Sequence, residues 1–542
     1  MGYRTPTCPI ARSCGGCDWL SVPYPIQLKR KQQQVVELLG PLGEKFGVSV
    51  EDIRGMRKPL AFRHKAATPF APGTRGRVRS GFYAAGTHRI VACEACLVED
   101  QRARDILNDV ARLASRFGVH AYDEDRGRGT LRHAVIRTGY ATDEMLLTLV
   151  VNGQRLPHER EFVSSLQRLH PEITGIILNV NQRRTNAILG RETRVLAGAA
   201  TMHDKLLNCT FEIGPTSFYQ TNPKQTEVLY QLALEGVFGV REKNDNERLS
   251  SGSSNCHTSH DRTDSLIGSP LRILDAYCGT GTIGICAAKE ADSRGIPVEL
   301  IGVDQVENNI AMAERNARAN AVSARFVCDD ATRFITQEAK RGASYDVVVL
   351  DPPRAGSTPT FLKAVEQLAP KRVVYVSCNV VTQARDLEVL LASGYKPERI
   401  VPVDMFPHTK HVETVVLLSH KAPDSHINVK VEFGEGKGKV PLDKIAERAE
   451  KYKPKEKVTY KKIKEYIEEK YGFKVHTAYI AEVKRAFGLP MYDAPNAVEK
   501  LKNRKAHPTK DKVRAITDAL IHFELISKKE ASAVKIAHLS AI

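Results

Sequence analysis

Two side chains that could carry out covalent or proton-transfer chemistry stand directly after short apolar runs. Asp351 ends the run VVVLD, and Cys378 ends the run VVYVSC. The carboxyl ends of parallel strands meet at one edge of an α/β sheet, where ligands bind. We therefore expect both side chains to line one crevice. A thiol before a helix N-terminus can ionise to a nucleophilic thiolate, although a packed structural cysteine is the alternative.

A glycine-containing loop, LDAYCGTGTIG, follows an earlier apolar run. Gly279 and Gly281 would let the backbone pass close to a ligand, and Asp304, at the end of the next run, could accept hydrogen bonds from ribose hydroxyls. Asp275 would repel a pyrophosphate. The loop therefore favours an adenosine cofactor without phosphates, S-adenosylmethionine, over NAD; a plain strand-to-helix turn is the alternative.

The cysteines form a third pattern, because five of the eleven fall within the first 96 residues. Cys8, Cys14 and Cys17 are spaced C-x5-C-x2-C, and Cys93 and Cys96 follow far downstream. Several thiolates could converge on one metal centre. By spacing alone, Cys14, Cys17, Cys93 and Cys96 could form a four-thiolate zinc site, which would leave Cys8 spare.

The elements that must position these residues alternate between short β-rich runs and helix-length segments from Leu271 onward, which predicts a parallel sheet with helices on both faces. The fold class is therefore α/β, with a Rossmann-like domain. The polar, Ser-rich stretch 241–270 is predicted to be a disordered insertion in which Cys256 is incidental. We expect a cysteine-cluster region (1–100), a central mixed α+β domain (101–205), the Rossmann-like domain (206–420, with the insertion at 241–270) and a basic helical accessory domain (425–542).

The formal charge of +17 favours a polyanionic partner, with a merely basic soluble protein as the alternative. From Lys421 onward, 27 Lys and Arg face 17 Asp and Glu. No apolar run is long enough to span a bilayer, and the first residues lack the apolar core of a signal peptide. We expect a cytoplasmic monomer with no membrane partner.

Four motifs in order, SFYQTN, VLDPPRAGS, YVSCN and DMFPHTKHVETVVLLS, resemble those of the RNA uracil-5-methyltransferases, and the resemblance covers residues 1–420. It implies S-adenosylmethionine as cofactor and C5 of a uridine in RNA as the methylated atom. Cys378 matches the nucleophile that adds to C6 of uracil, and Glu413 matches the general base. His408 and His411 are alternatives for proton transfer.

The resemblance also assigns the binding residues. Phe218 and Gln220 of SFYQTN match residues of the cofactor–base pocket, where Phe218 could stack on a flipped base or pack in the core. Asp351 matches a residue that aligns the target uracil beside the cofactor. The cofactor itself would contact a set of loop and strand-end residues: Gln220, Asp275, Gly279, Gly281, Asp304, Asp330 and Asp351.

The N-terminal pattern is similar to that of the iron–sulfur branch of this family. That resemblance implies a [4Fe–4S] cluster held by Cys8, Cys14, Cys17 and Cys96, which would fold the N-terminal region and support RNA binding. The small β-barrel RNA-binding domain common in the family has no counterpart before Cys8. We expect the basic C-terminal tail to supply that affinity through a helix-turn-helix-like pair, with a solvated charged appendage as the alternative.

Other activities stay open at this point. The same fold could methylate cytosine C5 or a base nitrogen, but cytosine enzymes generally need a second cysteine, and the fourth strand ends in Asp-Pro-Pro-Arg. A non-catalytic ribosome-assembly protein is a further alternative. The cysteine pattern favours 23S ribosomal RNA over transfer RNA as the substrate.

Overall fold

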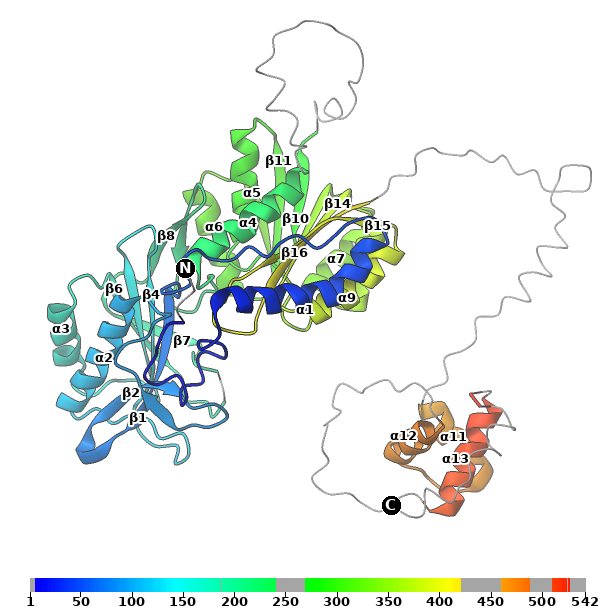
Figure 1. Ribbon diagram of the computed structural model, residues 1–542, viewed down its shortest axis with the longest axis horizontal. Helices are drawn as coiled ribbons and strands as arrows, with labels where there is room; N and C mark the ends of the chain where they lie inside the picture. Colours follow the sequence, from blue (N-terminus) through cyan, green and yellow to red (C-terminus); the bar gives the residue numbers. More distant parts are fainter. Residues whose placement is uncertain are drawn as a thin grey trace, which may run out of the picture. The chain divides into compact units, whose positions relative to one another are not determined.

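The chain divides into two compact units, 1–425 and 426–542. The computed structural model describes residues 5–185, 187–239, 269–420, 460–487, 509–523 and 525–526 (Figure 1). The expected insertion at 241–270 lies outside these residues except for its last two positions, and Cys256 lies outside them too.

The larger part of the first unit is a seven-stranded sheet with the order β12-β11-β10-β13-β14-β16-β15. The first five strands in this order run parallel, and β16 runs antiparallel to both of its neighbours. The strands are β10 (Leu271–Asp275), β11 (Val298–Asp304), β12 (Ala324–Cys328), β13 (Val347–Leu350), β14 (Arg372–Ser377), β15 (Tyr395–Val403) and β16 (Glu413–His420). Uniformly buried runs such as VVVL form the central strands because both faces of the sheet are covered.

Helices on the two faces of this sheet bury separate cores. On one face lie α4 (Pro223–Phe238), α5 (Thr282–Ser293) and α6 (Glu307–Ala319). On the other lie α7 (Ala331–Lys340), α8 (Pro359–Leu368) and α9 (Val380–Ala392). Helix α4 begins at Pro223, where the Asn222 side chain caps the first turn by accepting from the Gln225 amide. The Rossmann-like α/β fold predicted for this region is confirmed.

The N-terminal helix α1 (Tyr24–Glu44) also belongs to this layer, because its Val35 and Leu39 are buried in the same core as α9. The Lys31 ammonium, fully buried, donates to the Asp404 carboxylate at 2.5 Å, and the Tyr24 hydroxyl donates to the same carboxylate at 2.6 Å. These bonds fasten α1 to the segment that leads into β16.

A second seven-stranded sheet, with the order β3-β2-β1-β4-β5-β6-β7, carries α2 (Gln101–Arg116) and α3 (Glu159–Leu169) packed in its core. This sheet spans the boundary expected at residue 100, because β1–β3 lie before residue 100 and β1 pairs with β4 after it. The strands are β1 (Lys65–Pro72), β2 (Val78–Tyr83), β3 (Ile90–Ala92), β4 (Leu131–Thr138), β5 (Met145–Val151), β6 (Gly175–Val180) and β7 (Glu192–Gly198). A hairpin, β8 (Met202–Leu206) and β9 (Cys209–Ile213), leads back to the Rossmann-like layer.

The second unit contains α11 (Tyr460–Tyr471), α12 (Thr477–Ala486) and α13 (Lys510–His522). Their apolar faces form a core of their own around Ile467, Ile480 and Ile516. The two helices and the intervening turn predicted from the sequence are confirmed in α11 and α12, where Gly472 adopts a positive φ of 73° just past the end of α11. Among the helices of the described ranges, none has the length and apolarity needed to cross a bilayer.

Candidate active site

The predicted catalytic side chains meet at one edge of the Rossmann-like sheet. Asp351 directly follows β13, and Cys378 directly follows β14. Glu413 begins β16, and because Thr414 pairs with Ser377 across the β14–β16 ladder, Glu413 lies level with Cys378. Segments more than 60 residues apart in the sequence are thereby brought to one point.

Three acidic side chains at this edge, those of Asp275, Asp351 and Glu413, have their pKa raised by burial. The Asp275 and Glu413 side chains are 1% and 5% exposed. Burial raises the pKa of Asp351 to about 7. Burial, joined by the charges of Asp351 and Asp304, also raises the pKa of Asp275 to about 7. Burial and the charge of Asp351 hold the pKa of Glu413 well above its ordinary value.

Arg354 opposes this accumulation of negative charge, and sequence reasoning had not assigned it a role. Burial and the charges of Glu413 and Asp351 raise the pKa of Cys378, whereas the Arg354 guanidinium lowers it by its charge and by a hydrogen bond. Asn379 caps α9 and donates from its side-chain amide to the Arg354 carbonyl at 2.9 Å. Both residues stand within the DPPR and YVSCN motifs, so the motifs contained the signal.

The glycine loop leaves space beside a buried carboxylate. Gly279 and Gly281 adopt positive φ values of 54° and 79°, and a Cβ at Gly279 would face open space. Asp275 accepts from the Gly284 amide at 3.0 Å with one oxygen, while its other oxygen is buried without a partner among the described residues. A buried orphan oxygen beside an open loop fits a hydrogen-bond donor on a bound ligand.

Two other predicted cofactor residues lie at the same edge. Asp304 ends β11 and accepts from the Val306 amide at 2.8 Å and from the Asn309 side chain at 3.1 Å. Asp330 caps α7 through the Arg333 amide at 2.9 Å. Each carboxylate is therefore held in place by local hydrogen bonds at the carboxyl ends of the strands.

The SFYQTN segment forms the loop between β9 and α4. Phe218 is 60% exposed, which excludes the core-packing alternative and leaves its ring available to a ligand. The Asn222 side chain donates to the Met405 carbonyl at 2.9 Å, and so ties this loop to the segment before β16. Gln220 lines a small cavity on the side of the loop that faces β1 and β4.

The two histidines considered for proton transfer differ in their surroundings. His408 is fully buried, with one ring nitrogen 2.8 Å from the Pro59 carbonyl and the other 3.1 Å from the Gln27 side chain. Both of its nitrogens are thus engaged in holding the segment before β16. His411 is partly exposed, and burial and Arg354 lower its pKa.

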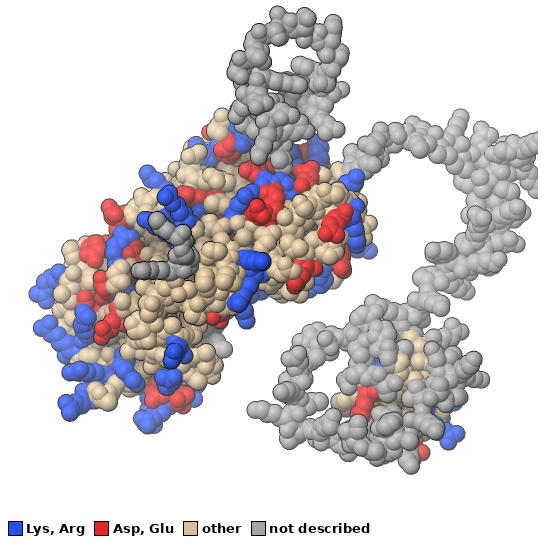
Figure 2. All heavy atoms as spheres, viewed as in Figure 1, with Lys and Arg blue, Asp and Glu red and all other residues tan. Residues whose placement is uncertain are grey.

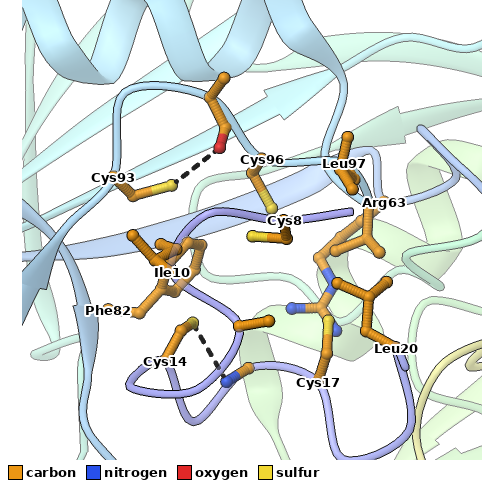
Figure 3. Close-up of a pocket in the computed structure, with 14 residues that line it drawn as sticks. Cys8, Ile10, Cys14, Cys17, Leu20, Arg63, Phe82, Cys93, Cys96 and Leu97 are labelled. Carbon is orange, nitrogen blue, oxygen red and sulfur yellow. Dashed lines mark hydrogen bonds between the residues drawn. The ribbon is translucent and has the colours of Figure 1, made fainter. Parts of the chain in front are cut away.

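Five cysteines line one cavity near the N-terminus: Cys8, Cys14, Cys17, Cys93 and Cys96. Figure 3 shows Cys8, Cys17 and Cys96 around a common space, with the Arg63 side chain reaching between them. The Cys93 thiol instead donates to the Ala95 carbonyl at 3.2 Å. Within the described ranges, however, no three His, Cys, Asp or Glu side chains are arranged as a ligand set for a metal ion.

The thiols of this cavity interact electrostatically. Burial and the neighbouring Cys96 raise the pKa of Cys17 to about 12, while Arg63 opposes that rise. The neighbouring Cys93 lowers the pKa of Cys96 to about 7. Cys96 therefore ionises more readily than Cys17, and a metal ligand must be ionised.

Comparison with known proteins agrees with this geometry. Residues 263–421 match the family model described as tRNA (Uracil-5-)-methyltransferase. An uncharacterized RNA methyltransferase of Halalkalibacterium halodurans is 37% identical over 76% of this chain and 83% of its own length. One from Staphylococcus aureus strain N315 is 36% identical over 77% and 84%.

Among solved structures, the tRNA (uracil-54, C5)-methyltransferase of Pyrococcus abyssi in complex with S-adenosyl-L-homocysteine matches with a TM-score of 0.56. It is 27% identical, over 76% of this chain and 86% of that one. The strand-end residues, the cofactor loop and these relatives lead to one conclusion: the chain belongs to the RNA uracil-5-methyltransferase family and is an S-adenosylmethionine-dependent RNA methyltransferase.

Proposed function

We propose that the enzyme methylates C5 of a uridine in 23S ribosomal RNA through a transient bond between the Cys378 sulfur and C6 of the uracil. The observation that carries the proposal is the β14–β16 register, which sets Glu413 level with Cys378 and beside Asp351. The reaction needs a thiol, a carboxyl group that can take a proton and a second carboxyl group, and all three stand at this edge of the sheet.

The chemistry follows from the weakness of C5 as a nucleophile. Addition of the Cys378 thiolate to C6 pushes electrons through the C5–C6 double bond onto the C4 oxygen, and C5 becomes nucleophilic. S-adenosylmethionine supplies an electrophilic methyl group on a sulfonium. Glu413 then removes the C5 proton, and the returning electrons expel the Cys378 sulfur and restore the double bond.

Asp351 would align the ring. An ionised carboxylate accepts a hydrogen bond from the uracil N3–H, and the pKa of about 7 makes that ionisation increasingly complete above neutrality. Phe218 offers an exposed aromatic face on which the extruded base can stack.

An arginine-rich surface supports RNA as the substrate. The β1–β2 hairpin exposes Arg75, Arg77 and Arg79, and Arg89 is exposed just before β3. Figure 2 shows Lys and Arg side chains at the end of the first unit that carries β1 and β2. Guanidinium groups grouped in this way bind phosphates and release counterions.

We further propose a [4Fe–4S] cluster held by Cys8, Cys14, Cys17 and Cys96, which favours 23S ribosomal RNA over transfer RNA. The support is that these four thiols line one cavity, together with the cationic Arg63. A four-thiolate cluster is anionic, so a guanidinium beside it is favourable. The cluster would join the N-terminal loop to the segment before α2 and so order the RNA-binding region.

The second unit is proposed as an accessory RNA-binding domain. It has its own apolar core, and the chain from Lys421 onward carries a clear excess of basic residues. A module with this composition adds phosphate contacts without adding base specificity.

Mapping by mass spectrometry identifies the substrate. In cells lacking the gene, 23S ribosomal RNA is expected to lack 5-methyluridine at one or more positions, with restoration by the wild-type gene but not by Cys378→Ala. Transfer RNA from the same cells is the internal control. Loss of methyl groups from transfer RNA alone would contradict the 23S assignment and leave the chemistry intact.

The covalent step has a direct signature in RNA containing 5-fluorouridine. The fluorine cannot leave as a proton does, so wild-type enzyme should accumulate a stable adduct at Cys378, seen as a gel shift and located by mass spectrometry. Glu413→Gln should form an adduct with ordinary RNA, because C5 deprotonation is blocked, while turnover falls by at least about 10²-fold. Normal methylation by Cys378→Ala would disprove the mechanism.

The cluster is tested by anaerobic purification with iron and sulfide analysis and visible absorption. We expect about four iron and four sulfide per chain, lost in Cys14→Ser and in Cys96→Ser but kept in Cys93→Ser. Cys328→Ser, at an exposed thiol of β12, is the matched control. Bound zinc without iron, or loss of iron in Cys93→Ser alone, would overturn the ligand set.

Deletion of residues 426–542 removes one compact unit. RNA binding should weaken, and the slope of log Kd against log salt should fall by about 0.9 for each phosphate that this unit neutralises. Affinity for S-adenosylmethionine, measured by calorimetry, should not change. An unaltered salt slope would show that this unit is a solvated appendage.

A further inference from the structure

A small cavity lies on the β1–β4 side of the loop that carries Phe218 and Gln220. It encloses about 250 Å³, open mouth included. Its walls come from β1, β4, the β8–β9 hairpin and the start of α4; the polar residues among them are His64, Lys65, Arg137, Thr138, Asp204, Tyr219 and Gln220.

Two cations face each other in this cavity. Lys65 begins β1 and is the direct cross-strand partner of Arg137 on β4. Like charges placed directly opposite on neighbouring strands are destabilising. Arg137 is only 4% exposed and Lys65 is half-buried, so water screens the pair poorly. Burial and the charge of Arg137 accordingly lower the pKa of Lys65 to about 8.

The acidic group in the same wall is already engaged. Asp204 accepts hydrogen bonds from the backbone amides of Tyr140 at 3.1 Å and Ala141 at 2.9 Å. His64 borders the cavity and lies 3.8 Å from Asp100, whose carboxylate binds Arg102. These carboxylates are therefore occupied by other donors.

Arg137 retains an unused donor. One terminal nitrogen of its guanidinium donates to the Ser217 carbonyl, at the start of the SFYQTN loop. Its Nε is buried without a hydrogen-bond partner among the described residues. If Arg137 only held the loop in place, its bond to the Ser217 carbonyl would be explained. The unpartnered Nε and the presence of Lys65 opposite would not be explained. Buried cations in proteins are ordinarily paired.

We propose that Lys65 and Arg137 form a binding site for an RNA backbone phosphate next to the target uridine. The site rests on the proposed function, since it deepens how that enzyme holds its RNA. A phosphate provides two anionic oxygens, which suit a guanidinium and an ammonium together. Phosphate contacts fix the position of a nucleic acid on its protein, and Tyr219 and Gln220, from the loop that carries Phe218, line the same cavity.

The carboxylate of S-adenosylmethionine is the other source of anionic oxygens that this cavity could take. The two sources differ in what the removal of Lys65 changes. If the cavity binds an RNA phosphate, removal of Lys65 lowers the salt dependence of RNA binding and leaves the affinity for the cofactor unchanged. If it binds the cofactor carboxylate, removal of Lys65 weakens cofactor binding and leaves the salt dependence unchanged.

The test uses the full-length chain with an unmodified 23S ribosomal RNA transcript. In Lys65→Gln the slope of log Kd against log salt should fall by about 1, while Lys65→Arg should keep the wild-type slope. Affinity for S-adenosylmethionine by calorimetry should stay within about twofold. Lys363→Gln, which removes an exposed charge from α8, is the matched control.

An unchanged slope in Lys65→Gln, at a wild-type melting temperature, would overturn the proposal. Weaker cofactor binding with an unchanged slope would overturn it as well and would assign the cavity to the cofactor carboxylate. If the variant melts early, Lys65→Met provides the same charge removal with a side chain suited to burial. Failure of the wild-type enzyme to methylate the transcript would count against the proposed function and not against the phosphate site.

Discussion

The site depends on three carboxyl groups and one thiol that meet at one edge of the Rossmann-like sheet. Asp275, Asp351 and Glu413 each have a raised pKa, and burial is the largest cause in all three. Burial also disfavours the Cys378 thiolate. Arg354 acts on both Cys378 and Glu413 in the opposite sense, so its position governs how much negative charge this edge holds.

Glu413 reaches this edge because β16 runs antiparallel to its neighbours in the sheet. A parallel β16 would deliver its first residue to the far edge of the sheet, whereas the antiparallel pairing puts Glu413 beside the end of β14. The segment before β16 must then be held firmly. The Lys31–Asp404 pair, both members fully buried, does this from α1, and removal of one partner of such a pair costs about 3–5 kcal/mol. The N-terminal region is thus bound to the catalytic edge.

Much of this arrangement could be predicted from the sequence. The alternation of strand and helix patterns predicted the Rossmann-like layer, and the C-terminal sequence predicted the helix pair that forms α11 and α12. The strand-end positions of Asp351 and Cys378 followed from local pattern alone. Local sequence patterns could not show which surfaces pack together. The sequence of α1 did not indicate that Val35 and Leu39 share a core with α9. The sequences of β1–β3 did not indicate that these strands pair into the same sheet as β4–β7.

Side-chain roles set by tertiary contact were also invisible in the sequence. Lys65 and Arg137 are 72 positions apart, and their opposition appears only once β1 pairs with β4. Arg354 lies within the motif VLDPPRAGS, but only the fold shows that it lowers the pKa of Cys378. For the cysteines, spacing left Cys93 and Cys96 equivalent, and the fold distinguishes them by giving the Cys93 thiol a backbone acceptor.

The electrostatics of the pocket connect these parts. Burial and the charges of Glu413 and Asp351 raise the pKa of Cys378 and so favour its neutral thiol. Arg354 acts in the opposite sense, because a cation in a poorly screened site stabilises a thiolate. In the proposed mechanism, the sulfonium of the methyl donor would add a second positive charge. The thiol of Cys378 would then ionise more readily with the donor bound than without it.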